Sequence, residues 1–231
     1  MEINKLKELE QRLSLNFKNR DLLLEALTHR SYLNEKPDWP HKHNERLEFL
    51  GDAVLELIVT EYLFNNYGDP EGVLTSWRAA LVNSVMLAEI SKKIELNDYV
   101  LLSQGERKDN GRARQYILAN ALEAIIGAIY LDQGYQETEK FIKKNILVEF
   151  PRIIAQKLYK DAKSLFQEKS QEIESVTPSY RVLDERGPDH DKTFKVGVYL
   201  EDELIGEGFG PSKQEAQQKA AEDALHKKDW S

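Results

Sequence analysis

The segment from His43 to Phe64, HNERLEFLGDAVLELIVTEYLF, constrains the fold of this chain more than any other. It contains helix-forming residues throughout, no proline and a single glycine, Gly51. At about 100° per residue it forms a helix with an apolar arc. The arc contains Leu47, Leu50, Val54, Leu57 and Ile58. Such an arc packs against other elements, and the first ~150 residues are expected to be almost wholly helical.

The opposite arc of this predicted helix carries only acids, which are Glu45, Glu48, Asp52 and Glu56. Like charges at spacings of three and four residues repel one another, and a hard divalent cation such as Mg²⁺ would relieve that repulsion. The alternative is an amphipathic helix whose acids face water. Gly51, which costs a helix about 1 kcal/mol, is explained if another backbone or side chain approaches closely there. Phe49 projects beside the acids and hints at a partner surface, so a metal site near an interface is favoured.

The string HNERLEFLGDAVL, residues 43–55, closely resembles the signature of ribonuclease III, the double-stranded-RNA endonuclease. The resemblance implies an all-α endonuclease domain, which we expect over residues 1–156. It also implies a homodimer, because one acidic cluster cuts one strand and a two-fold axis supplies the second cluster. Phe49 is our candidate for a residue that inserts into the partner.

A second apolar segment, residues 116–135, predicts a buried helix with two polar interruptions, Asn120 and Glu123, on one face. A buried carboxylate costs several kcal/mol unless it is paired or bound to metal. We therefore expect Glu123 to meet Glu48 and Asp52 at a site between the two helices. Most of the family has Asp where this chain has Asn120, whose carbonyl oxygen ligates Mg²⁺ without adding charge.

The resemblance assigns roles to these residues. The expected metal shell is Glu48, Asp52, Asn120 and Glu123, with Mg²⁺ as cofactor and Mn²⁺ as a substitute. The expected catalytic residues are Asp52, Glu123, Glu48, Glu45 and Glu71, the last two as outer acids that position water, metal or RNA. Glu71 matches the acid of the family's E-G-x-L-[ST] pattern. The segment LTHRSYLNE is expected to be a loop, with Thr28, His29 and Ser31 as parts of the scaffold.

The remaining helical predictions of the first half follow from spacing and capping residues. We expect helices over Ile3–Leu13, from Asn19 or Asp21 to Leu27, and as one long element over Val73–Ile90. A helical run over Lys140–Tyr159 is expected to be interrupted at Pro151. Residues 103–116 are polar and basic and predict a loop that meets phosphates or is simply solvated.

Beyond residue 157 the pattern predicts a small α+β domain. A helix at 161–175 precedes three alternating segments at 179–185, 192–200 and 204–210, and a last helix has Ser212 and Glu215 as a capping box. This α-β-β-β-α order resembles the double-stranded RNA-binding domain, expected over residues 157–231. Such domains read duplex shape through 2′-hydroxyls and phosphates. The resemblance implies RNA contacts from Gln167, Glu168, Pro188, His190, Lys213 and Lys219.

Charge and composition limit the possible functions. The net charge is −8, of which residues 1–160 carry −2 and residues 161–231 carry −6, so an RNA site has to be a local basic patch. The chain has no cysteine, which excludes disulfides and thiolate metal sites. No signal-peptide core and no stretch near ~18 apolar residues is present, so we expect a cytoplasmic protein without a membrane partner.

The expected function is metal-dependent hydrolysis of phosphodiesters in double-stranded RNA, leaving 5′-phosphate and 3′-hydroxyl ends, in the processing of ribosomal and messenger RNA precursors. One alternative is a duplex-RNA-binding protein that keeps the fold but has lost cleavage, and Asn120 is the residue that supports it. Another is an acidic helical scaffold with no role in RNA metabolism.

Overall fold

A computed structural model describes residues 3–108, 111–159, 162–188 and 192–230 of this chain of 231 residues. The chain divides into two compact units, residues 1–159 and residues 160–231, each of which is described by itself. The expected domain limit at residue 156 lies just before this division. None of the described helices is long and apolar enough to cross a lipid bilayer.

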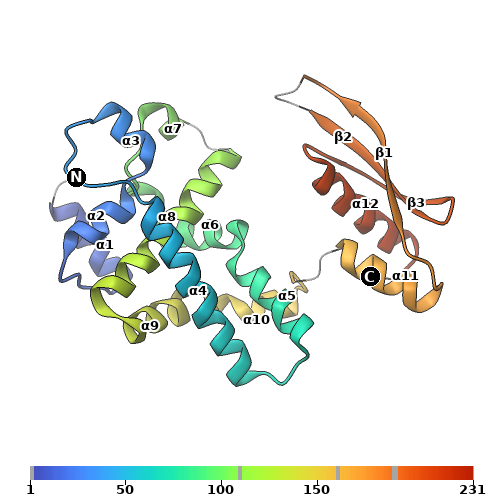
Figure 1. The fold of residues 1–231 in the computed structure, drawn as a ribbon, viewed down its shortest axis with the longest axis horizontal. Helices are drawn as coiled ribbons and strands as arrows, with labels where there is room; N and C mark the ends of the chain where they lie inside the picture. Colours follow the sequence, from blue (N-terminus) through green and yellow to red (C-terminus); the bar gives the residue numbers. More distant parts are fainter. Residues whose placement is uncertain (1–2, 109–110, 160–161, 189–191, 231) are drawn as a thin grey trace. The chain divides into compact units, whose positions relative to one another are not determined.

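The first unit is built from helices (Figure 1). Its α-helices are α1 (Ile3–Leu13), α2 (Arg20–Leu27), α3 (Arg30–Glu35), α4 (Glu45–Asn66), α5 (Glu71–Val82), α6 (Ser84–Lys93), α7 (Gln104–Lys108), α8 (Arg112–Gln133), α9 (Tyr135–Asn145) and α10 (Phe150–Ala155). Two 3-10 turns, η1 (Leu96–Asp98) and η2 (Leu147–Glu149), connect them.

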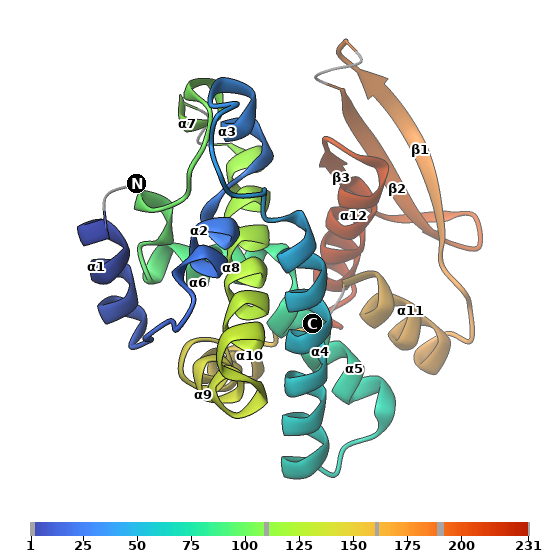
Figure 2. The ribbon, with the colours of Figure 1, turned by 60° about the vertical axis from the view of Figure 1, so that its left-hand side comes forward.

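Helices α4 and α8 form the centre of this unit and run side by side (Figure 2). Each has 22 residues, and α8 is buried on almost every side from Ile117 to Ile129. Helices α2, α6 and α9 pack around α8, and α5 packs against α4. The two segments that the sequence singled out are therefore direct neighbours in the core.

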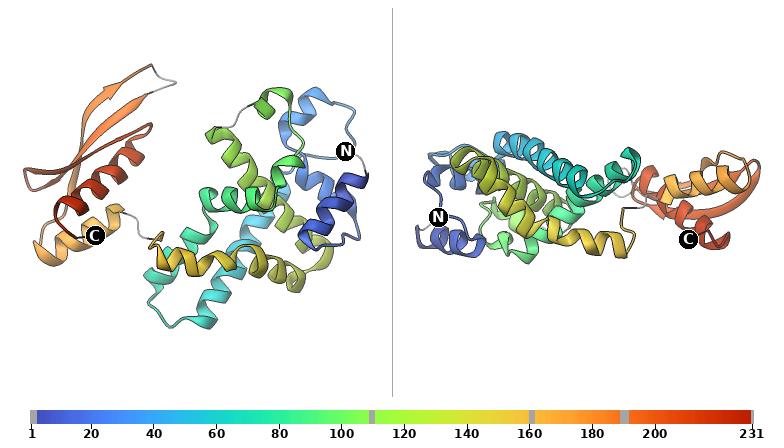
Figure 3. Two further views of the ribbon diagram at one scale, coloured as in Figure 1. Left: turned by 180° about the vertical axis from the view of Figure 1, so that it is seen from behind. Right: turned by 90° about the horizontal axis from the view of Figure 1, so that it is seen from below.

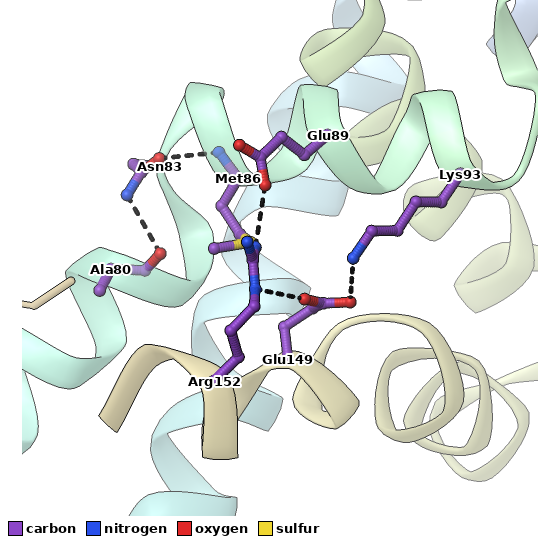
Figure 4. Close-up of polar contacts among 7 residues, drawn as sticks. All are labelled: Ala80, Asn83, Met86, Glu89, Lys93, Glu149 and Arg152. Carbon is purple, nitrogen blue, oxygen red and sulfur yellow. Dashed lines mark hydrogen bonds and ion pairs between the residues drawn. The ribbon is translucent and has the colours of Figure 1, made fainter. Parts of the chain in front are cut away.

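Local capping explains where two predictions were wrong. The helix expected over Val73–Ile90 is two helices, because Asn83 takes an extended conformation (ψ 157°) between α5 and α6. Its side-chain Oδ1 accepts a hydrogen bond of 2.9 Å from the Met86 amide and its Nδ2 donates to the Ala80 carbonyl at 3.1 Å (Figure 4). The segment after Thr28, expected as a loop, forms the short helix α3, with the side chain of His29 as its cap.

The last helix of the first unit is fastened to α6 by ion pairs (Figure 4). Arg152 lies 2.9 Å from both Glu89 and Glu149, and Lys93 Nζ lies 2.5 Å from Glu149 Oε1. The hydrogen bond from Lys93 is the main reason why the pKa of Glu149 is lowered. Pro151 does not interrupt a helix as expected, because it lies in the first turn of α10, where the missing N–H is tolerated.

The second unit is a three-stranded antiparallel sheet covered on one face by helices (Figures 1 and 3). Its elements are α11 (Ala162–Ile173), β1 (Ser179–Arg186), β2 (Thr193–Leu200), β3 (Glu203–Gly210) and α12 (Lys213–Lys227), with strand order β1-β2-β3. Helix α12 packs on β2 and β3, and α11 packs on α12. The predicted α-β-β-β-α order is confirmed. So is the capping box, since Ser212 Oγ accepts from the Glu215 amide at 3.2 Å.

Small residues set the distance between β3 and α12. A Cβ atom placed on Gly208 would lie 2.3 Å from the Ala216 carbonyl oxygen and 2.3 Å from the Ala220 amide nitrogen. Gly206 and Gly210 face α12 in the same way. The alternating glycines therefore let the helix lie directly on the strand, with the buried Phe166 of α11 filling the core beside them.

Candidate active site

The contact between α4 and α8 depends on a glycine in each helix. A Cβ on Gly51 would lie 1.8 Å from the carbonyl oxygen of Glu123, and a Cβ on Gly127 would lie 2.3 Å from the carbonyl oxygen of Leu47. Side chains at these positions would force the helices apart. The expectation that another backbone approaches Gly51 is confirmed. The contact brings the acids of α4 next to the polar residues of α8.

Two rows of polar side chains face each other along this contact. On α4, Asn44, Glu48 and Asp52 follow one another at single helical turns, and on α8 the same holds for Tyr116, Asn120 and Glu123. The side chain of Asn120 is hydrogen-bonded to Glu48, and Glu123 experiences the charges of both Asp52 and Glu48. The four residues expected to form a metal shell are therefore neighbours in the folded chain.

Burial and like charges disfavour ionisation in this cluster. Burial, followed by repulsion from Asp52 and Glu48, raises the pKa of Glu123 to about 8. Burial is also the largest reason why the pKa of Glu48 is raised, with Glu45 next, while the Asn120 hydrogen bond acts in the opposite direction. A divalent cation among these oxygens would reverse this cost, because it stabilises the charged carboxylates.

The donor set fits a hard cation by chemistry. Three carboxylates and an amide oxygen are ligands that Mg²⁺ accepts. Over the part of the chain that the structure describes, no three His, Cys, Asp or Glu side chains already lie at the spacing needed to hold a metal ion. The carboxylates therefore have to turn toward a common centre to hold one, and their role as ligands stays a prediction.

The structure places the two outer acids differently. Glu45, in the first turn of α4, pairs with Arg30 at 3.6 Å and with His43 at 3.8 Å, and lines the same pocket as Glu48. Glu71, in the first turn of α5, lines another pocket, together with Thr60, Leu63, Phe64, Asp69, Leu74, Thr75 and Arg78. Within one chain, Glu45 joins the cluster and Glu71 does not.

An exposed apolar stripe runs along α4. Phe49, Leu57 and Phe64 are 82%, 57% and 76% exposed. The prediction that Leu57 lies in the buried arc is wrong. The buried face of α4 is the one that contains Gly51, and Leu57 lies outside that face. Large apolar side chains exposed in a row are typical of a surface that another molecule covers.

In the second unit the structure leaves the predicted RNA-contacting residues exposed. Gln167 and Glu168 lie on α11, Pro188 lies after β1, and Lys213 and Lys219 lie in the first half of α12. His190 lies outside the described residues. Lys213 Nζ also lies 3.2 Å from Glu185 Oε1, so its charge is partly shared. Contact with RNA stays a prediction for all of them.

The sequence did not identify the residues at the N-terminal end of the two polar rows as part of the site. Asn44, Tyr116 and His29 line a pocket together with Glu48 and Asn120. The available signal was spacing, since Asn44 precedes Glu48 by one helical turn and Tyr116 precedes Asn120 by one turn. His29, which is expected to be part of the scaffold, also lines this pocket.

Comparison with known proteins identifies the family. A model described as Ribonuclease-III-like matches residues 19–150, and a model described as double-stranded RNA binding motif matches residues 162–228. A protein of Sulfurovum named Ribonuclease 3 is 47% identical over 96% of this chain and 98% of its own length. The chain belongs to the ribonuclease III family. A Ribonuclease 3 of Nitratiruptor is 42% identical over 96% of both chains.

Solved structures give the same result for the first unit. The nuclease domain of ribonuclease III from Campylobacter jejuni aligns with a TM-score of 0.57 at 44% identity. The alignment covers 63% of this chain and 99% of that domain, whose description mentions a region involved in dimer formation. The expected ribonuclease III family and fold, helical nuclease domain and double-stranded RNA-binding domain, are confirmed.

Proposed function

We propose that this ribonuclease III is an endoribonuclease that cleaves double-stranded RNA by metal-dependent phosphodiester hydrolysis. The observation that carries the proposal is the meeting of Glu48, Asp52 and Glu123 between α4 and α8, in a chain whose second unit matches a duplex-RNA-binding motif. Acids forced together at an open surface are typical of nucleases that hold a divalent ion against a phosphate.

The divalent ion required by this family of nucleases is proposed to be Mg²⁺, for which Mn²⁺ substitutes. When bound, it supplies a more acidic water and stabilises the leaving 3′ oxygen. Glu48, Asp52, Asn120 and Glu123 would hold it. Glu45, held by Arg30 and His43 at the edge of the cluster, would orient the water or the RNA. The products would carry 5′-phosphate and 3′-hydroxyl ends.

The alternative of a binding protein without cleavage is not favoured. Asn120 replaces an acid, but its side chain still lies in the cluster and bonds Glu48. Three carboxylates remain, and the relatives that match nearly the whole chain are named Ribonuclease 3. We infer ribosomal and messenger RNA precursors as substrates, because their hairpins supply duplex segments, and a cytoplasmic location, because such RNA is processed there.

The proposed enzyme is a homodimer formed across the exposed stripe of α4. The pocket lined by Thr60, Phe64 and Leu74 is open and largely apolar, and it lies on the same helix as Phe49. In a two-fold dimer, Phe49 of each subunit enters this pocket of the other, so that each contact is made twice. The dimer covers the three exposed apolar side chains of α4.

This dimer also accounts for Glu71. The pocket that receives Phe49 of the partner subunit has Glu71 in its lining. Because Phe49 adjoins Glu48 in the chain, its insertion brings Glu71 toward the acids of the partner. Glu71 would then complete the acidic cluster of the other subunit instead of its own.

Incubation of duplex RNA with the protein tests the function. We expect cleavage with Mg²⁺, none with EDTA, and none with the Glu123→Ala variant in Mg²⁺. Binding of duplex by the wild type without cleavage in Mg²⁺ would instead establish the binding-protein alternative. For the dimer, sedimentation of wild type and Phe49→Asp is expected to give dimer and monomer, and a monomeric wild type at micromolar concentration would refute it.

A further inference from the structure

The sheet of the second unit has an outward face that carries exposed apolar side chains. Helices α11 and α12 cover the other face, and the RNA contacts predicted for these helices lie on that side (Figures 1 and 3). On the outward face, Leu183, Leu204 and Phe209 are 39%, 43% and 55% exposed. Apolar side chains gathered at the surface mark places where another molecule docks.

These side chains form one patch because Gly197 leaves room for them at the middle of the sheet. A Cβ on Gly197 would lie 2.7 Å from Leu204 Cδ1 and 3.1 Å from both Leu183 Cδ1 and Tyr199 Cε2. Side chains from all three strands therefore close over the glycine. Phe209 extends the patch along β3, since it lies between two glycines that face α12 and its own ring points outward. We call these four side chains, those of Leu183, Tyr199, Leu204 and Phe209, the sheet patch.

The cations at outward positions of the strands are each paired with an acid of the same unit. The pairs are Arg181 with Asp202 at 3.3 Å, Lys195 with Glu207 at 2.8 Å and Arg186 with Asp184 at 2.6 Å. Two of these cations also lie over rings of the sheet patch, Arg181 over Tyr199 and Lys195 over Phe209. The pairing leaves little positive charge for an anionic partner such as a nucleic acid or an acidic membrane.

The turn between β2 and β3 borders the sheet patch with three consecutive acids, Glu201, Asp202 and Glu203. Among the residues that the structure describes, Asp202 has a cationic partner, whereas Glu201 and Glu203 have none. The second unit as a whole carries a net charge of −6. Charge complementarity therefore favours a basic partner and disfavours a second copy of the same acidic unit.

We propose that the outward face of this sheet docks a basic polypeptide of another protein. An apolar side chain of the partner covers the sheet patch over Gly197, and its lysines or arginines meet Glu201 and Glu203. Because the predicted RNA contacts of α11 and α12 lie on the opposite face, the surface stays accessible when duplex RNA is bound. The proposal gives the second unit a function beyond RNA binding and does not depend on cleavage by the first unit.

Binding of a fluorescently labelled peptide to the full-length protein tests this proposal. The probe has a leucine-rich centre and lysines at both ends. One matched probe has serines in place of the leucines, and another has glutamates in place of the lysines. Fluorescence anisotropy measures binding by wild type, Leu204→Ser and Glu203→Lys. The matched control variants are Ile173→Ser, at an exposed apolar residue of α11, and Glu222→Lys, at an exposed acid of α12.

We expect wild type to bind the lysine–leucine peptide at least about tenfold more tightly than either matched probe. Leu204→Ser should weaken binding about tenfold, because the peptide then covers a polar side chain instead of an apolar one. Glu203→Lys should weaken it about threefold at low salt and less at high salt. Ile173→Ser and Glu222→Lys should bind the peptide as wild type does. Leu204→Ser and Glu203→Lys should still bind duplex RNA, which shows that the second unit is folded.

Equal peptide binding by Leu204→Ser and wild type would overturn the proposal, and so would the absence of saturable binding by wild type. If Leu204→Ser also loses duplex binding and is therefore misfolded, Glu203→Lys decides in its place, and wild-type affinity of that variant at low salt would refute docking. Sedimentation tests the other occupant. Association of wild type beyond a dimer, lost in Leu204→Ser, would assign the face to a second copy of the chain and overturn the basic partner.

Discussion

In both units glycines allow two elements to pack with their backbones in close contact, but the contact has a different role in each unit. In the first unit, Gly51 and Gly127 let α4 and α8 touch through their backbones. In the second, Gly206, Gly208 and Gly210 let β3 lie against α12. Both contacts exclude even a methyl group. The close approach is therefore a general packing device, which does not by itself mark a functional site.

The flanking side chains make the difference. Beside Gly51 lie Glu48 and Asp52, whose repulsion reaches across to Glu123. Beside the strand glycines lie alanines, of which Ala216 and Ala220 are completely buried. In the first unit the contact holds like charges close together although they repel one another. In the second unit it packs a helix on a sheet through small apolar residues, and the residues predicted to contact RNA lie exposed. A close contact that confines like charges is the better indicator of chemistry.

The strongest test of this comparison is Gly51→Ala. The added Cβ would lie 1.8 Å from the Glu123 carbonyl, so the helices must move apart. We expect a loss of about 3 kcal/mol in the free energy of unfolding and at least about 100-fold in cleavage rate. Denaturant unfolding and single-turnover cleavage measure the two effects. Gly68→Ala, with nothing within 4 Å of the added Cβ, is the control. If Gly51→Ala has the stability and the cleavage rate of wild type, the close contact at Gly51 does not hold the acids in place and the comparison fails.

Glu123→Gln tests whether the confined charges are costly without metal. The pKa of Glu123 is raised from 4.5 to about 8 in the folded protein, so the fold binds the proton of this carboxyl more tightly than the unfolded chain does. The stability that comes from this proton is complete below pH 4.5 and is lost as the pH rises through 8. In EDTA at pH 8.5 we therefore expect the variant to be about 2 kcal/mol more stable than wild type, with no difference near pH 4. The expected difference in stability is smaller than the free energy that corresponds to the whole pKa shift, because the ionised side chains move apart.

The same variant should no longer be stabilised by Mg²⁺, whereas the melting temperature of wild type should rise with added ion. Thermal unfolding between pH 4 and 9, with and without Mg²⁺, measures both effects. Glu56→Gln, an exposed acid on α4, is the matched control and should behave as wild type. Equal Mg²⁺ stabilisation of Glu123→Gln and wild type would show that this acid does not hold the ion.

Gly208→Ala examines the second contact. Its Cβ would lie 2.3 Å from backbone atoms of α12, and we expect the second unit to lose about 1–2 kcal/mol of stability and duplex binding to weaken with it. Mg²⁺ stabilisation of the first unit should not change. Hydrogen exchange measures the stability of the second unit, and fluorescence anisotropy measures duplex binding. Gly197→Ala should reduce stability less, because the atom nearest to its added Cβ is the flexible end of the Leu204 side chain. Loss of Mg²⁺ stabilisation in Gly208→Ala would show that the two contacts are coupled.

Lys213→Ala is expected to have the smallest effect. Glu185 shares the charge of Lys213, so removal should weaken duplex binding by only about threefold and lower the salt dependence by about one counterion. Anisotropy titrations at several salt concentrations measure both. Lys227→Ala, at the other end of α12 and paired with Asp223, should leave binding as it is. If the two variants bind equally well, the phosphate contact is not at the start of α12.

Much of the fold was readable from local patterns. The helices α1, α2, α4 and α8, the three strands and the caps at Asn19 and Ser212 follow from apolar periodicity and side chains that bond nearby amides. The break at Asn83 was not readable, because asparagine also occurs inside helices, and its presence did not by itself indicate that its side chain caps α6 through the Met86 amide. The acids of the candidate site were predicted from their spacing and from the family resemblance.

Sequence alone determined which residues share a face of a helix, because that depends only on the helical repeat. The tertiary structure decided which faces meet. It turned Leu57 outward, separated Glu71 from the acids of its own chain, and aligned Asn44 with Tyr116 at the end of the cluster. The reason is that the crossing of α4 and α8 depends on two glycines 76 positions apart in the chain, Gly51 and Gly127. The closeness of their backbones is not a property of either segment alone.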